Sequence, residues 1–336
     1  MPARSPSAAR SAGNPLRSAL WPFGLLYGTV AAVRNWTFDA KLRAAHRLPV
    51  SVVSIGNLTV GGTGKTPTVA YLCELARTLG RRPGVLARGY GRAAGAELND
   101  EGVLLQRRLP WLLQAQDPDR VAAGQRLVQE GADYLVLDDG LQHRRLYRDL
   151  DVVCLDAELP FGNGHCLPAG DLREFRSGLR RAGLVLLTRA GRLAAEQFAA
   201  RCSRIRTIAD REVGVYACEH EASDVVVQPT GTVLPLAFVR GRRAVLLSAI
   251  ARPQSFRATA EALGVEVVRE FCHRDHHHFT AAEVSAAAGA AAASGALLLT
   301  TEKDDTRLLP FDVERHVLRI QLRFLDGSPS PKDWLL

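Results

Sequence analysis

The chain has 336 residues, of which 47 % are hydrophobic and 23 % are charged. This composition is ordinary for a globular protein and excludes a mainly disordered, collagen-like or disulfide-scaffold class. Its six cysteines contain no CxxC pair, which excludes a zinc ribbon and is typical of a reduced, cytosolic protein. At roughly 150 residues per domain, the length predicts about two domains.

Positive charge is concentrated at the amino-terminal end. The net charge is +8, and residues 1–50 hold seven basic side chains against one acidic residue, Asp39. The rest of the chain is nearly neutral, which argues against a nucleic-acid-binding body. A basic end beside an apolar run favours contact with an anionic membrane surface. The seven basic residues are Arg4, Arg10, Arg17, Arg34, Lys41, Arg43 and Arg47.

Residues 19–33 carry no charge, but the run is shorter than the ~20 apolar residues that a bilayer span needs. Apolar side chains in this run and just before it recur at helical spacing, and Arg17 and Arg34 flank the run. The pattern predicts an amphipathic helix, either packed on its own domain or lying in a membrane interface. A signal peptide is a third alternative, although no small-x-small cleavage site precedes Arg34. The apolar stripe consists of Leu16, Leu20, Phe23, Tyr27 and Val30.

From residue 49 onward, strand-like apolar runs alternate with helical patterns, which predicts an α/β fold with a parallel sheet covered on both faces. A Pro/Gly-rich stretch at 229–241 is typical of a linker or hairpin, and a second alternating unit follows it. We therefore expect a basic amphipathic segment at 1–48. A P-loop NTPase-like nucleotide-binding domain at 49–222 and a smaller α/β domain at 223–336 should follow it.

The strongest local pattern is a glycine-rich loop between the first predicted strand and a helix. Such a loop turns backbone N–H groups toward phosphates, while Lys65 reaches the β/γ-phosphates and Thr66 binds Mg²⁺. Thr59 stands where the strict pattern has glycine, but the strand–loop–helix context supports the assignment. The predicted cofactor-binding residues are Gly61, Gly62, Thr63, Gly64, Lys65 and Thr66.

A second predicted strand, 134–137, ends in two carboxylates, Asp138 and Asp139. In a phosphate-loop enzyme, acids at the tip of a neighbouring buried strand hold the magnesium shell. We therefore predict that both residues serve a metal site.

The densest histidine cluster is His273-Arg274-Asp275-His276-His277-His278. Adjacent histidines in one loop cannot all face one ion, and no Cys or His partner lies nearby at metal-ligand spacing. A metal site, a solvated polar loop and an acid/base or substrate-contacting histidine all remain open, and we favour the last.

Taken together, eight short motifs in this order make the chain resemble the tetraacyldisaccharide 4'-kinase family, the lipid A 4'-kinases. The resemblance extends from about residue 15 to residue 310. The motifs are Gly56-Asn57, Gly61–Pro67, Arg88-Gly89-Tyr90-Gly91, Asp100-Glu101, Asp138-Asp139-Gly140-x-Gln142-His143, Leu172-Arg173-Glu174, Asp275-His276-His277 and Thr301-Glu302-Lys303-Asp304.

The resemblance implies transfer of the γ-phosphate of ATP, with Mg²⁺, to the 4'-hydroxyl of a tetraacylated glucosamine disaccharide 1-phosphate. It also implies that Asp100 and His276 form a catalytic dyad, and we expect them to meet between the two units. Glu174 is implied to be a further acid at the metal, and Arg120 and Arg173 to contact the disaccharide.

The family's membrane-associated amino-terminal helix favours the interfacial alternative for the apolar stripe. We accordingly expect a peripheral protein on the cytoplasmic face of the inner membrane, with no nucleic acid and no obligate protein partner. The chain departs from the family at Asn99, where glycine is usual, and at Phe175, where proline is usual. Neither change removes a chemical group, so we expect activity to be retained.

Two other functions compete with this one. A phosphate-loop NTPase could act on a protein partner or on another small acceptor, and it would turn over nucleotide without the disaccharide. A nucleotide-binding module without chemistry would have no need of Asp100, His276 and Glu174.

Overall fold

The structure, a computed structural model, describes residues 19–92 and 95–336, and these form two units. Unit 1 comprises the chain up to Gly89 with Trp111–Glu219 and Arg323–Leu336, and unit 2 comprises Tyr90–Pro110 and His220–Leu322. Residues 90–110, which the sequence analysis placed in the nucleotide-binding segment, therefore belong to unit 2. The reason is a long-range contact, since the helix formed there packs against a helix near residue 305.

Unit 1 is built on a parallel sheet with strand order β7-β6-β5-β1-β4-β2-β3. Its central strands are buried along nearly their whole length, which explains their continuous Val/Leu/Ile sequences. This confirms the predicted α/β fold with a parallel sheet. The strands are β1 (Ser51–Gly56), β2 (Pro83–Ala87), β3 (Leu113–Gln116), β4 (Tyr134–Asp138), β5 (Leu150–Asp156), β6 (Leu184–Thr188) and β7 (Gly214–Gln228).

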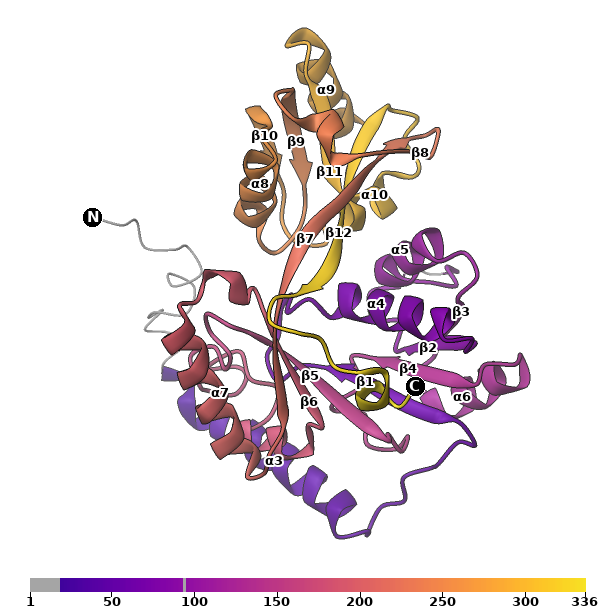
Figure 1. The fold of residues 1–336 in the computed structure, drawn as a ribbon, viewed down its shortest axis with the longest axis vertical. Coiled ribbons are helices and arrows are strands. Elements are labelled where there is room, and N and C mark those ends of the chain that lie inside the picture. Colours follow the sequence, from indigo (N-terminus) through magenta and orange to yellow (C-terminus); the bar gives the residue numbers. More distant parts are fainter. Residues whose placement is uncertain (1–18, 93–94) are drawn as a thin grey trace. The chain divides into compact units, whose positions relative to one another are not determined.

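Helices α4 (Lys65–Thr78) and α6 (Arg120–Gln129) cover opposite faces of this sheet (Figure 1). The chain moves outward from β1 to β2 through α4 and returns from β3 to β4 through α6, so right-handed crossovers place the two helices on different faces. Among the described residues the core includes two apolar clusters, one containing Leu155 and Leu187 and the other Leu86 and Leu135. Helix α7 (Ala195–Ala209) and the 3₁₀ helices η1 (Arg176–Arg181), η2 (Ala190–Arg192) and η4 (Pro331–Trp334) complete unit 1 with α3.

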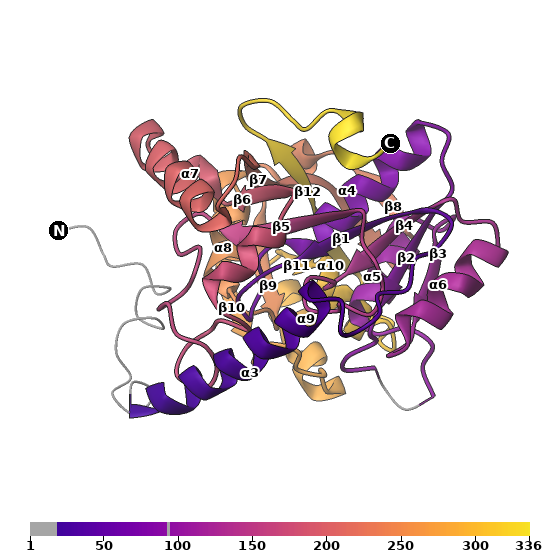
Figure 2. The same ribbon diagram turned by 90° about the horizontal axis from the view of Figure 1, so that it is seen from below.

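The amino-terminal helix α3 (Trp21–Asp39) lies at the margin of unit 1 in both ribbon views (Figures 1 and 2). It confirms the predicted helix but extends beyond Val30. Leu16 of the predicted apolar stripe and the flanking Arg17 lie outside the described residues.

Unit 2 has the strand order β10-β9-β11-β12-β7, and β8 pairs antiparallel with the second half of β7. The register Val227↔Thr232 shows that the Pro/Gly-rich stretch begins with a hairpin, one of the two alternatives expected there. The strands are β8 (Thr232–Leu234), β9 (Arg243–Ser248), β10 (Glu266–Cys272), β11 (Leu297–Thr301) and β12 (Arg315–Phe324). The helices are α5 (Asp100–Arg108), α8 (Pro253–Ala262), α9 (Ala281–Ala293), α10 (Glu302–Leu308) and the 3₁₀ helix η3 (Leu236–Val239).

Candidate active site

The phosphate loop connects β1 to α4 in unit 1. Gly61 and Gly64 have φ angles of 107° and 85°, in the region that other residues rarely adopt. Asn57 holds the loop from inside, because its amide nitrogen donates to the Thr63 hydroxyl at 3.0 Å. Lys65 begins α4 at once, so the helix N-terminus and its unpaired N–H groups face the loop. The predicted residues thus form an anion-binding cradle.

The two predicted carboxylates lie beside this loop, because β4 pairs with β1 and places Asp138 opposite Ile55. Lys65 Nζ is 3.4 Å from Asp139 Oδ1, and the Arg173 guanidinium is 2.6 Å from Asp139 Oδ2. Burial alone raises the pKa of Asp139, but the two cations outweigh it and hold that pKa below its usual value. Asp139 is therefore ionised at neutral pH.

Arg173 reaches this cluster through backbone pairing that the sequence did not reveal. The N–H of Arg173 donates to the Leu58 carbonyl at 2.8 Å, and the N–H of Val60 donates to the Asp171 carbonyl at 2.8 Å. The segment carrying Arg173 is thus anchored to the start of the phosphate loop. In the structure its guanidinium binds Asp139, whereas the sequence analysis expected it at the disaccharide.

Arg120 is the first residue of α6 and is almost fully buried. Its Nε atom has no hydrogen-bond partner among the described residues. Desolvation lowers the pKa of this guanidinium, opposed mainly by the charge of Asp139. A buried cation with an unused donor is suited to an anionic ligand, since leaving it unpaired costs free energy.

The residues fit a magnesium ion in the chemistry of their donors. Thr66 supplies a hydroxyl, and Asp138 and Asp139 supply carboxylates, which are the hard oxygen ligands that Mg²⁺ prefers. Glu174 differs, because it is almost fully buried and its two oxygens accept four hydrogen bonds: Arg181 donates at 2.7 and 2.8 Å, and Gln142 and Asn35 donate at 2.9 and 2.8 Å. These contacts favour a positioning role for Glu174 over the metal-ligand role that was expected.

In unit 2, Asp100 and His276 come together. His276 Nδ1 is 3.7 Å from Asp100 Oδ2, and the Nε of Arg307 on α10 is 3.0 Å from the same oxygen. His276 has φ of 62°, a left-handed conformation that is costly for a side chain of this size and typical of functional sites. The pair lies within one unit, because α5 belongs to unit 2, and this corrects the expectation that the two residues meet between units.

Asn99, one of the two departures from the family pattern, is the N-cap of α5. Its side-chain oxygen accepts a hydrogen bond from the N–H of Gly102 at 3.0 Å, so it fixes the start of the helix on which Asp100 stands.

Three comparisons with known proteins agree on one family. A family model described as tetraacyldisaccharide-1-P 4'-kinase matches residues 16–336. The chain belongs to this family. It is 44 % identical to a tetraacyldisaccharide 4'-kinase of Anaeromyxobacter dehalogenans over 79 % of this chain and 73 % of that one. A counterpart in Syntrophus aciditrophicus is 36 % identical over 78 % of this chain and 76 % of that one.

Among solved structures, the LpxK protein of Aquifex aeolicus in complex with ATP is similar in fold, with a TM-score of 0.74 and 27 % identity. The match covers 93 % of this chain and 96 % of that chain. The chain is therefore a kinase with the phosphate-loop α/β fold, and ATP with a divalent metal is its cofactor. The family assignment does not favour the NTPase alternative.

The outer surface of helix α3 of this kinase is apolar. Gly24 and Gly28 face the rest of unit 1. A Cβ atom on Gly24 would lie 2.7 Å from the Cys166 carbonyl oxygen, and one on Gly28 would lie 2.6 Å from the Phe175 ring. The glycines allow close packing and leave the large side chains outside. The exposed apolar residues of α3 are Trp21, Phe23, Leu25, Leu26, Tyr27, Val30, Val33 and Trp36. Within residues 19–92 and 95–336, no helix has the length and apolar character needed to cross a membrane.

The remaining histidines of the cluster make a separate arrangement. His277 Nε2 is 3.0 Å from a Glu283 carboxylate oxygen, and His273 Nδ1 is 3.4 Å from the other. Glu283 also caps α9 through Thr280, and its pKa falls to about 2, chiefly because His277 hydrogen-bonds to it. The three side chains are close enough to share a metal ion. Glu283 is already held by its capping contacts with Thr280.

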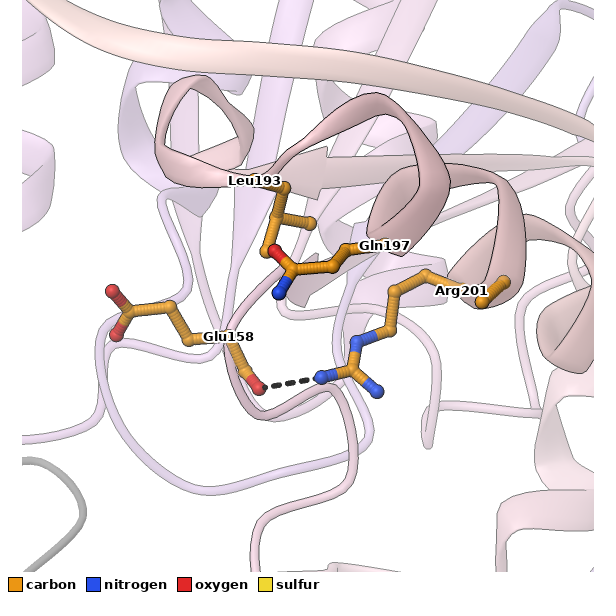
Figure 3. Close-up of a pocket in the computed structure, with 5 residues that line it drawn as sticks. Glu158, Leu193, Gln197 and Arg201 are labelled. Atoms are coloured by element: carbon orange, nitrogen blue, oxygen red, sulfur yellow. Dashed lines mark hydrogen bonds between the residues drawn. The ribbon is translucent and has the colours of Figure 1, made fainter.

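One surface pocket of about 400 Å³ lies elsewhere in unit 1, between the segment after β5 and helix α7 (Figure 3). Arg201 donates to the Glu158 carbonyl oxygen across it. None of the candidate site residues lines it. Sequence analysis missed Arg307 because only the packing of α10 against α5 brings it to Asp100.

Proposed function

We propose that the chain transfers the γ-phosphate of ATP to the 4'-hydroxyl of tetraacyldisaccharide 1-phosphate, the reaction of lipid A 4'-phosphorylation. The observation that carries this proposal is the pairing of Asp100 with His276 in a chain that also has a complete phosphate loop. A sugar hydroxyl is a weak nucleophile, so a kinase acting on it needs a positioned proton acceptor, whereas a passive nucleotide binder does not.

In unit 1, the loop amides and Lys65 bind the phosphates of the nucleotide, and Thr66, Asp138 and Asp139 hold the metal. Mg²⁺ bound there supplies charge neutralisation on the phosphate oxygens. Asp139 keeps Lys65 and Arg173 in place in the absence of substrate, and Arg120 offers its buried guanidinium to an anionic group of the nucleotide or the disaccharide.

In unit 2, Asp100 accepts the proton of the attacking hydroxyl, and His276 orients the carboxylate. Arg307 holds the Asp100 carboxylate in place, since its buried guanidinium is 3.0 Å from Asp100 Oδ2. Proton transfer of this kind contributes typically 10²–10⁴-fold to a rate.

We also propose that the exposed apolar face of α3 docks on an anionic membrane surface, the cytoplasmic leaflet of the inner membrane. The support is the row of large apolar side chains facing solvent, together with the exposed bases Arg34, Lys41, Arg43 and Arg47 around and beyond the end of the helix. A tetraacylated substrate stays in the bilayer, so its kinase has to act at the membrane surface.

The test of the reaction is product identification. Purified protein with ATP, Mg²⁺ and tetraacyldisaccharide 1-phosphate should give a bisphosphorylated product whose new phosphate ³¹P–¹H NMR assigns to the 4' position. The Asp100→Asn variant keeps the shape of the side chain and should bind ATP normally while forming product at least ~10²-fold more slowly. A product phosphorylated elsewhere, or full activity of Asp100→Asn, would contradict the proposal.

A further inference from the structure

Lys303 lies at the second position of α10, and its ammonium faces the histidine of the proposed dyad. Nζ is 3.1 Å from His276 Nε2. The same nitrogen is 3.6 Å from a Glu101 carboxylate oxygen and 3.6 Å from an Asp275 carboxylate oxygen. The ammonium thus hydrogen-bonds to the imidazole and forms ion pairs with two carboxylates of unit 2.

This contact determines which imidazole nitrogen carries the proton. A lysine ammonium has donors only, so Nε2 of His276 must be the acceptor, and the proton of the neutral ring is then on Nδ1. Nδ1 is the atom that faces Asp100 Oδ2 at 3.7 Å. The ring is thereby set to donate toward the carboxylate, and the carboxylate is left as the proton acceptor.

Arginine would not replace Lys303 in this role. Its guanidinium is a planar fork suited to bidentate carboxylates, whereas the ammonium is a compact charge that fits a single ring nitrogen. The chain otherwise uses arginine almost throughout. Only four of its 43 basic residues are lysines, namely Lys41, Lys65, Lys303 and Lys332. Of these, Lys65 lies at the phosphate loop and Lys303 lies beside His276.

The short helix that carries Lys303 is fixed from its buried side. Thr301 caps α10 by accepting a hydrogen bond from the N–H of Asp304, and the buried Asp304 carboxylate accepts one from the N–H of Ala249 at 3.0 Å. The N–H of His276 donates to the Ala249 carbonyl at 3.2 Å. Lys303 and His276 are therefore both held to the turn at Ala249.

We infer that Lys303 is a positioning residue of the kinase, which holds His276 in the Nδ1–H tautomer and turns it toward Asp100. The inference rests on the proposed function of the dyad. The tautomer is measured without enzymatic turnover, so the inference about Lys303 and the proposed function of the dyad can be contradicted independently.

The experiment records ¹⁵N–¹H NMR spectra of the imidazole rings in the full-length protein near neutral pH, with His276→Gln used to assign the His276 signals. The wild-type protein should show Nδ1 protonated and Nε2 as an acceptor. Lys303→Met, which keeps the length of the side chain, should give a mixture of tautomers. Its kcat should fall roughly 10- to 100-fold with KM for both substrates unchanged.

Lys332→Met is the matched control, since this exposed lysine lies in unit 1, and it should match wild type in both measurements. Lys303→Arg keeps the charge and should recover only part of the lost kcat. A wild-type spectrum with Nε2 protonated overturns the inference whether or not any variant folds. A Lys303→Met defect confined to KM would instead make Lys303 a substrate contact and would equally overturn it.

Discussion

At the scale of single residues, the kinase depends on a small number of cations placed against carboxylates. In unit 1, Lys65 and Arg173 share Asp139, and in unit 2, the Arg307 guanidinium contacts the Asp100 oxygen that the neutral His276 ring also faces. Burial alone would raise the pKa of Asp139, and the charges of Lys65 and Arg173 outweigh that effect. Removing one partner in either cluster should therefore change activity more than it changes the fold.

Lys65→Ala should lower kcat by ~10²-fold or more, because its ammonium stabilises charge on the transferring phosphoryl group. Steady-state kinetics and thermal unfolding of the variant check this, with Lys332→Ala as the control. A variant that keeps most of its activity would show that the phosphate loop is wrongly assigned.

The Asp100–His276 pair should behave as a unit. Asp100→Ala and His276→Ala should each reduce mainly kcat, and the double variant should lose far less than the product of the two single losses. His278→Ala is the control, since this exposed neighbour makes no contact with Asp100 among those the structure describes. Fully multiplicative losses, or a larger defect at His278 than at His276, would show that the dyad is wrong.

His143 predicts a pH dependence of stability. Burial, together with the charges of Arg120 and other nearby arginines, lowers its pKa from 6.5 to about 4. Because the unfolded chain takes up this proton near pH 6.5 and the folded protein only near pH 4, the free energy of unfolding falls as pH drops through that window. His143→Asn should make the melting temperature less sensitive to pH between these limits. An unchanged slope in the two proteins would refute a buried neutral imidazole.

At the scale of elements, the features best predicted from the sequence are those formed by contiguous residues. The phosphate loop, its strand and its helix are contiguous, so Lys65 and Thr66 could be placed directly. Asp138 could be placed because parallel strands end at one sheet edge. Arg307 and the membership of α5 in unit 2 depend on contacts between residues about two hundred positions apart. The position of Arg173 depends on its backbone hydrogen bond to Leu58. Neither this pairing nor the long-range helix packing leaves a local pattern in the sequence.

Helix α3 gives the prediction at this scale. Leu26→Ser with Val30→Ser removes two exposed apolar side chains and leaves Gly24, Gly28 and Asn35, which contact unit 1, unchanged. Burial of such a side chain contributes roughly 1.5–3 kcal/mol, so affinity for anionic vesicles should fall on the order of 10²-fold. Co-sedimentation with phosphatidylglycerol vesicles checks this.

Val233→Ser is the control for that experiment, because Val233 is an exposed apolar residue of β8 in unit 2. Activity toward a detergent-dispersed substrate should be unaffected in both variants. If the α3 variant binds vesicles as tightly as wild type, the helix has no part in membrane docking. High salt should weaken binding only partly, since it screens the basic residues but not the apolar face.

At the scale of the whole molecule, the chemistry is divided between the two units. Unit 1 carries the phosphate loop and the carboxylates proposed for the metal site, and unit 2 carries the proposed base with its supporting histidine, arginine and lysine. The strands β7 and β12 each belong partly to one unit and partly to the other, so neither unit is a continuous segment of the chain. This arrangement fits an enzyme whose nucleotide and acceptor are handled by different parts of the chain.

The central claim is that the acceptor is the acylated disaccharide, and the most direct test is the acceptor dependence of ADP release. With ATP and Mg²⁺ present, we predict that adding tetraacyldisaccharide 1-phosphate raises ADP release by at least ~10²-fold, as expected when the reacting hydroxyl is positioned against the nucleotide. One phosphate should appear on lipid for each ADP formed. ADP release that is equally fast without the lipid would contradict the account and identify an NTPase instead.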